Sequence, residues 1–203
     1  MTVSVRASVD SRNEDFAGLA RTAAGEACLI GHIAAGKRRA FEALYRVYFP
    51  RLTRFLQRMS RNPMLIEEIV NDTLLVVWRK ASTFDGSSKV STWIFAIGYR
   101  RACKSLQALD EPVEGGGDEQ EGSDADRPDW HFDQQRMAQA VDIALAALPL
   151  AQRTAFQLTF YHDMAYTEIA EIMDCPVNTI KTRLFHARKR LAALLDGQLE
   201  GRP

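Results

Sequence analysis

The sequence predicts an all-α protein made of two small helical domains. Apolar residues recur at spacings of three and four through residues 26–107 and again through residues 136–196, which is the period of amphipathic helices. Between these stretches, residues 108–135 are acidic, rich in Gly and Ser, and carry no such period. No alternating strand pattern occurs in the first stretch. The sequence therefore predicts two helical units joined by a connecting segment.

The first unit begins after a polar arm. Residues 1–25 are rich in small polar residues and are expected to be disordered, or weakly helical near Phe16–Ala24. Residues 26–60 are predicted as a helical pair, with Gly36 between the two apolar stripes. Pro50 lies inside the second stripe and is expected to kink or restart that helix, because proline lacks the backbone N–H that the helix needs.

Two further helices are predicted before residue 107. The Asn62-Pro63 pair marks a break, and residues 64–82 then follow a strong helical period. A Gly/Ser-containing loop covers residues 84–90. Ser91 or Thr92 is expected to cap the next helix, which should run to about Leu106.

The connecting segment is strongly charged. Residues 108–135 hold ten acidic residues and one basic residue, whereas residues 29–107 hold five acidic and fourteen basic residues. The segment has too few apolar side chains to form a core, so it is expected to be a flexible tether. A second interpretation is that its carboxylates mimic nucleic acid and lie in a basic groove.

The C-terminal unit contains a helix-turn-helix pattern. A first helix should end near Leu148, and Pro149 should start the second. A short helix with Ile169 and Ile172 then meets the turn Asp174-Cys175-Pro176. The helix that follows the turn is the predicted recognition helix, and residues 197–203 are expected to be a tail.

The recognition helix combines one apolar stripe with positive flanks. Ile180, Leu184, Ala187 and Leu191 share one face, and from residue 178 to 191 there are five Lys or Arg and no acid. Cationic flanks can contact phosphates while the polar middle reads base edges in a major groove. A plain solvated amphipathic helix is the alternative, but the turn and the preceding short helix favour DNA recognition.

Composition excludes several other classes of protein. Cys28, Cys103 and Cys175 have no metal-ligand spacing, so reduced thiols and no metal site are expected. No apolar run is long enough to span a bilayer and no signal peptide is apparent, so a cytoplasmic location is expected. Four scattered histidines and the lack of a phosphate-binding loop or nucleophile motif argue against an enzyme, and no cofactor is expected.

Four stretches of the sequence resemble one known family. They are AFEALYRVYFPRLTRFL, IEEIVNDTLLVVWRKASTFDGSSKVSTWIFAIGYRRA, ALAALPLAQRTAFQL and AYTEIAEIMDCPVNTIKTRLFHARKRL. In this order they resemble a bacterial RNA polymerase sigma factor of the extracytoplasmic-function (ECF) group, with region 2 at 26–107 and region 4 at 136–196. The resemblance implies a protein that binds core RNA polymerase, directs it to promoters and promotes DNA melting. It also implies contacts with the clamp helices of the largest subunit and the flap of the β subunit. An anti-sigma factor, often membrane-anchored, is the implied regulator, and no small-molecule substrate is implied.

The resemblance also implies three groups of site residues. Polymerase binding falls to Glu68, Asn71, Asp72 and Arg79. Recognition and melting of the −10 element fall to Phe84, Ser87, Ser88, Lys89, Trp93, Tyr99, Arg100, Arg101 and Lys104. Recognition of the −35 element falls to Asn178, Thr179, Lys181, Thr182, Arg183, Phe185, His186 and Arg188, with Arg183 and Arg188 toward phosphate.

The sequence departs from the family at a few of these positions. Arg100 and Lys104 stand where many relatives carry Asn and Asp, and His186 stands where Arg is common. These differences leave the −10 preference and one −35 contact open. A stand-alone helix-turn-helix regulator that binds duplex DNA without polymerase is the alternative function; it would need a sensing domain that the first unit does not resemble.

Overall fold

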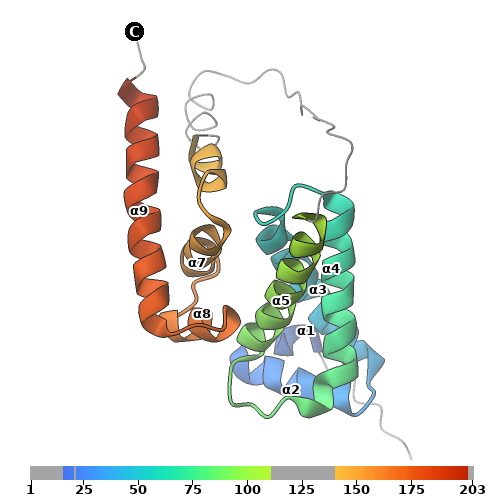
Figure 1. The fold of residues 1–203 in the computed structure, drawn as a ribbon. Helices are drawn as coiled ribbons and strands as arrows, with labels where there is room; N and C mark the ends of the chain where they lie inside the picture. Colours follow the sequence, from blue (N-terminus) through green and yellow to red (C-terminus); the bar gives the residue numbers. More distant parts are fainter. Residues whose placement is uncertain (1–15, 21, 111–139, 201–203) are drawn as a thin grey trace, which may run out of the picture.

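The computed structural model describes residues 16–20, 22–110 and 140–200. All regular secondary structure in these ranges is helical, as the sequence predicts. The greater part of the predicted N-terminal arm and most of the acidic segment lie outside the described residues. Figure 1 shows the remaining chain as two groups of helices, α1–α5 and α7–α9, that lie against each other through α5 and α8.

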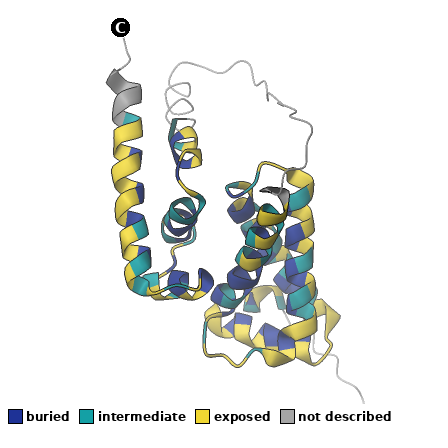
Figure 2. Cartoon of the chain, viewed as in Figure 1, coloured by how far each residue is buried: buried dark blue, intermediate teal, exposed yellow. Residues whose placement is uncertain are grey.

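The N-terminal half is built on three long helices. α3 (Arg38–Gln57), α4 (Pro63–Lys80) and α5 (Val90–Asp110) pack on one another, with α2 (Ala23–Ala34) crossing beneath them. Their buried faces are dark in Figure 2 and include Tyr48, Phe55 and Phe95, each with no exposed area. Such large apolar side chains supply most of the stabilisation of a small domain. A short 3-10 turn, η1 (Ala81–Thr83), follows α4.

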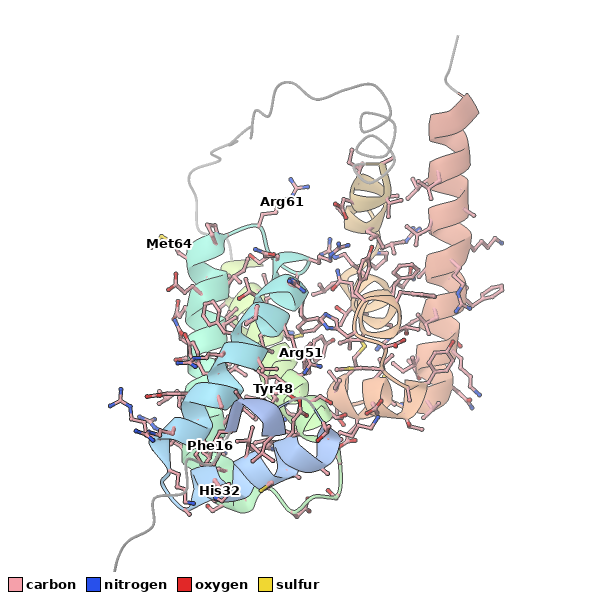
Figure 3. All side chains as sticks on the ribbon, turned by 180° about the vertical axis from the view of Figure 1, so that it is seen from behind. Phe16, His32, Tyr48, Arg51, Arg61 and Met64 are labelled. Atoms are coloured by element: carbon pink, nitrogen blue, oxygen red, sulfur yellow. The ribbon has the colours of Figure 1, made fainter. Side chains whose placement is uncertain are left out.

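The first helix is a single turn. α1 (Phe16–Leu19) lies within the stretch that the sequence predicts as weakly helical. The rings of Phe16 and His32 pack edge-on with 5.3 Å between their centroids, and the two side chains are neighbours in Figure 3. A Cβ on Gly25 would stand 2.1 Å from the carbonyl oxygen of Leu19, so only glycine permits this close approach of α1 to α2.

Two local details differ from the expectations. The restart expected at Pro50 does not occur, because buried residues such as Tyr48 and Leu52 hold α3 in the core on both sides of the proline. The kink, the other expectation at Pro50, stays a prediction. α5 begins at Val90, before either predicted cap. Thr92 is fully buried and its hydroxyl donates to Glu168 of the other half instead of capping the helix.

The C-terminal half contains the predicted helix-turn-helix. Residues 140–146 are helical, and α7 (Leu150–Phe160) starts directly after Pro149 as predicted. α8 (Tyr166–Ile172) and α9 (Val177–Glu200) flank the predicted turn, in which Asp174 takes a positive φ of 49°. α9 thus extends into the residues expected to be a tail. No helix in the described ranges is both long and apolar enough to cross a membrane.

Candidate nucleic-acid interface

The recognition helix α9 presents a positive, open face. Its predicted apolar stripe is buried: Ile180, Leu184 and Ala187 have at most 1% of their area exposed. Phe185, on the opposite side, is 62% exposed, and its ring contacts His186 edge-on at 5.4 Å. Most of the residues assigned to the −35 element are exposed along this face: Asn178, Lys181, Thr182, Phe185, His186 and Arg188.

Two members of the predicted −35 group are less open. Thr179 is partly buried in the first turn of α9. Arg183 turns toward the helix-turn-helix core, where its guanidinium lies 3.4 Å from the Cys175 sulfur and 4.0 Å from the Met173 sulfur. In this arrangement Arg183 supports the turn, whereas Arg188 remains exposed and stacks at 5.5 Å on Phe160.

The loop before α5 is held by local contacts. Asp85 accepts hydrogen bonds from the Ser87 backbone N–H at 2.9 Å and from its hydroxyl at 2.7 Å, and these bonds lower the pKa of the Asp85 carboxyl. Gly86 between them has a φ of 75°, a conformation that favours glycine. Phe84 packs on Trp93 at 5.2 Å. The loop therefore places Ser87, Ser88 and Lys89 at the start of α5.

The proposed −10 surface faces the C-terminal half. The Lys89 amine lies 3.0 Å from a carboxylate oxygen of Glu168, and the Thr92 hydroxyl donates to the same oxygen at 3.2 Å. Burial and the neighbouring Cys103 thiol raise the pKa of the half-buried Tyr99. Arg100 and Lys104 remain exposed on α5. The two halves thus meet where the sequence places melting residues.

The proposed polymerase surface lies on α4. Glu68, Asn71 and Arg79 are exposed there, and Asn71 accepts a hydrogen bond from the Tyr45 hydroxyl at 3.1 Å. Asp72 is partly buried and forms an ion pair with Arg101 of α5. The structure thereby joins one residue predicted for polymerase binding to one predicted for DNA binding. In Figure 1, α4 lies on the side of the molecule away from α9.

Sequence reasoning missed the contacts between the halves. His162, after α7, lies 4.9 Å from the Phe95 ring and 5.9 Å from the Phe55 ring. Burial, followed by the positive charges of three arginines on α3 and at its C-terminal end, lowers the pKa of His162 to about 4. Arg58 stacks on Tyr161 at 4.1 Å. A single histidine after a helix gives no sequence signal for such a packing role.

Two family models match separate parts of the chain. One, described as Sigma-70 region 2, matches residues 44–110, and the other, described as Sigma-70, region 4, matches residues 138–191. The ECF RNA polymerase sigma factor RpoE of Cereibacter sphaeroides is 34% identical over 157 residues, which span 75% of this chain and 84% of that protein. The chain belongs to the ECF sigma factor family.

Other relatives agree with this sigma factor assignment. The ECF RNA polymerase sigma-E factor of Haemophilus influenzae is 29% identical over 174 residues, covering 80% of this chain and 91% of that protein. The sigma factor RpoE from Bartonella quintana, solved with the anti-sigma factor NepR, superposes with a TM-score of 0.55 at 26% identity, over 77% of this chain and 96% of that one. CnrH, solved with the cytosolic domain of CnrY, shares the fold at a TM-score of 0.63 and 23% identity, over 85% and 97% of the two chains. This family membership disfavours the stand-alone regulator.

No group of three or more His, Cys, Asp or Glu side chains among the described residues is placed to hold a metal ion.

Proposed function

We propose that this sigma factor divides promoter recognition between its two halves. α9 reads the −35 duplex, the loop and start of α5 hold melted −10 bases, and α4 binds the clamp helices of core polymerase. Region 4 is proposed to bind the β-subunit flap. Family membership together with the exposed cationic face of α9 carries this proposal, since the face has no acidic residue from Asn178 to Leu191.

The chemistry of the two DNA surfaces supports different tasks. On α9, Lys181 can donate to guanine acceptors and the exposed Phe185 can pack on a thymine methyl group. On α5, aromatic and cationic side chains can hold unstacked bases and the phosphates between them. Melting in this scheme is a binding event and requires no covalent chemistry, so no enzymatic activity or cofactor is proposed.

The contacts between the halves make −10 binding conditional. The Glu168 carboxylate of α8 forms an ion pair with the Lys89 amine and accepts a hydrogen bond from the Thr92 hydroxyl, both at the start of α5. A DNA phosphate would have to compete with this carboxylate for the Lys89 amine. Binding to polymerase, which engages the two regions at separate sites, is proposed to separate the halves and free this surface.

An anti-sigma factor is proposed as a second partner of this sigma factor. The support is the similar B. quintana sigma factor, which was solved in complex with NepR. Cytoplasmic action follows from a polymerase partner and is proposed on that ground.

The test of the −35 assignment uses two variants of α9. Lys181→Ala and Phe185→Ala should weaken selection of the −35 element about tenfold each, because each removes a base contact worth roughly 1–3 kcal/mol. Binding to core polymerase should be unchanged. Transcription by reconstituted holoenzyme on a promoter library measures the first effect and pull-down of core polymerase the second. Unchanged −35 selection in both variants, or loss of their binding to core polymerase, would show that α9 has been assigned the wrong surface.

A further inference from the structure

A basic cleft lies along the line where α3 meets α7. Its volume is about 480 Å³, and its lining includes Arg51, Arg54 and Arg58 on one side and Gln157, Tyr161 and His162 on the other. A second hollow of about 660 Å³ shares Arg58 and Gln157 with the first and adds Arg61 and Arg153. Figure 3 labels Arg51 and Arg61, which mark two ends of this arginine series. The volume lies in the range of small-molecule sites.

The charge in this cleft is only partly balanced. Five arginines face two aspartates, Asp142 and Asp163. Arg58 pairs with Asp142 at 3.2 Å, and Arg51 lies 3.6 Å from Glu26. Among the described residues, Arg54 and Arg61 have no ion pair or hydrogen bond. Burial and then the charge of Arg61 lower the pKa of Arg153, which is a further sign of positive potential.

A buried amide in the same cleft is unpartnered. Gln157 is 1% exposed, yet neither its Oε1 nor its Nε2 atom has a hydrogen-bond partner. Leaving such a group unsatisfied costs about 1–3 kcal/mol. A deprotonated inorganic anion offers only acceptors, so it would leave the Gln157 Oε1 atom without a donor. A ligand that satisfies both atoms must also carry a donor, such as a ribose hydroxyl or a base amine.

An aromatic side chain completes the set of groups. The Tyr161 ring is 48% exposed and already carries the Arg58 guanidinium at 4.1 Å. An exposed tyrosine beside a guanidinium is a suitable platform for stacking a nucleobase. Cations, an amide and an aromatic ring therefore converge within one cleft.

We propose that this cleft binds a nucleoside oligophosphate. The phosphates lie on Arg54, Arg58 and Arg61, while the base or ribose satisfies Gln157 and contacts Tyr161. Because the cleft has one wall from each half of the chain, the ligand neutralises the arginines at the seam and stabilises the closed arrangement. This goes beyond promoter recognition, since neither α9 nor the start of α5 takes part in the cleft.

The experiment uses the full chain without polymerase and three probes: ATP, inorganic triphosphate and adenosine. Calorimetry should show ATP binding at least tenfold more tightly than triphosphate, and adenosine binding very weakly. Arg54→Ala should weaken both phosphate probes about tenfold, whereas Gln157→Leu should weaken ATP about tenfold and leave triphosphate unchanged. Arg46→Ala, an exposed arginine on α3 outside the cleft, is the matched control and should change neither.

The pKa of His162, which lines the cleft, reports whether the ligand binds there. Burial, and then the charges of Arg51, Arg54 and Arg58, lower the pKa of His162. Saturating ATP would neutralise the arginine part of this effect, so it should raise the His162 pKa by about one unit in an NMR titration. Equal affinities for ATP and triphosphate, or equal losses from Arg54→Ala and Arg46→Ala, would overturn the proposal as non-specific anion binding. If the His162 pKa is already high without ligand and falls when the acids of residues 108–135 are neutralised, the chain's own acidic segment occupies the cleft and the proposal is wrong. Promoter-specific transcription by the Gln157→Leu variant separates either failure from failure of the proposed function.

Discussion

Replacing Glu168 should open the contact between the two halves. Its carboxylate accepts a hydrogen bond from the backbone N–H of Ala165, directly before α8, at 2.8 Å. It also contacts Lys89, directly before α5, and Thr92 in the first turn of α5. Burial by itself raises the pKa of Glu168, but these three donors outweigh it and the net pKa is lowered. The charged carboxylate therefore stabilises the closed arrangement.

The size of this effect follows from the contacts. The Lys89 side chain is 62% exposed, so its ion pair is worth about 0.5–1 kcal/mol. The Thr92 hydroxyl is buried and its hydrogen bond adds about 1 kcal/mol. Glu168→Gln removes the charge but keeps an acceptor, so it should shift the closed-to-open equilibrium roughly twofold to fivefold. Adding Thr92→Val should bring the total shift to about 10–30-fold.

Amide hydrogen exchange followed by mass spectrometry measures this shift in the peptides of α8 and the first turns of α5. At neutral pH the exchange rate of these peptides should rise by the factors given above for Glu168→Gln and for the double variant. Glu171→Gln, on the exposed side of α8, should leave the exchange rate unchanged. Because the pKa of Glu168 is lower in the closed state, the contact is fully present above its ordinary value of 4.5 and is lost as the pH falls below it. Unchanged protection in the double variant would show that this carboxylate does not hold the halves together.

Three further substitutions test a buried leucine, a histidine with a low pKa and a glycine with a positive φ. Leu184→Ala should lower the free energy of unfolding by about 2–5 kcal/mol, measured by urea denaturation, because Leu184 is 1% exposed; Phe185→Ala on the open face should cost less than 1 kcal/mol. The low pKa of His162 means that the unfolded state takes up a proton first as the pH falls from about 6.5 toward 4, so stability should decline over that window; His162→Phe should remove this part of the decline, and an identical pH profile would contradict it. Gly86→Ala should destabilise the loop before α5 by about 1 kcal/mol because of its positive φ, whereas Ala at exposed Gly31 within α2, where nothing crowds a Cβ, should be neutral or stabilising in thermal unfolding.

Local sequence patterns predicted the helices and the helix-turn-helix well. The spacing of Ile180, Leu184, Ala187 and Leu191 identifies the buried side of α9, because a helix repeats every 3.6 residues regardless of its surroundings. Pro149 and the turn before Pro176 likewise fix helix starts through backbone chemistry alone. These features depend on residues only a few positions apart.

The contacts between the halves could not be predicted in this way. Glu168 of α8 and Thr92 of α5 are 76 positions apart, so no local period relates them. The same holds inside the N-terminal half, where Asp72 of α4 and Arg101 of α5 are 29 positions apart. Thr92 looked like a helix cap because threonine often is one, but its hydroxyl is used by a distant carboxylate. Pairings of this kind depend on how the helices pack, which local propensity does not determine.

Multi-round transcription with bacterial core polymerase that lacks any specificity subunit tests the division of promoter recognition most directly. Adding this sigma factor should yield transcripts with defined start sites from cognate genomic fragments, and Lys181→Ala should reduce them on promoters that depend on the −35 element. Only random initiation with the wild-type protein, at levels equal to core polymerase alone, would contradict the assignment of both halves.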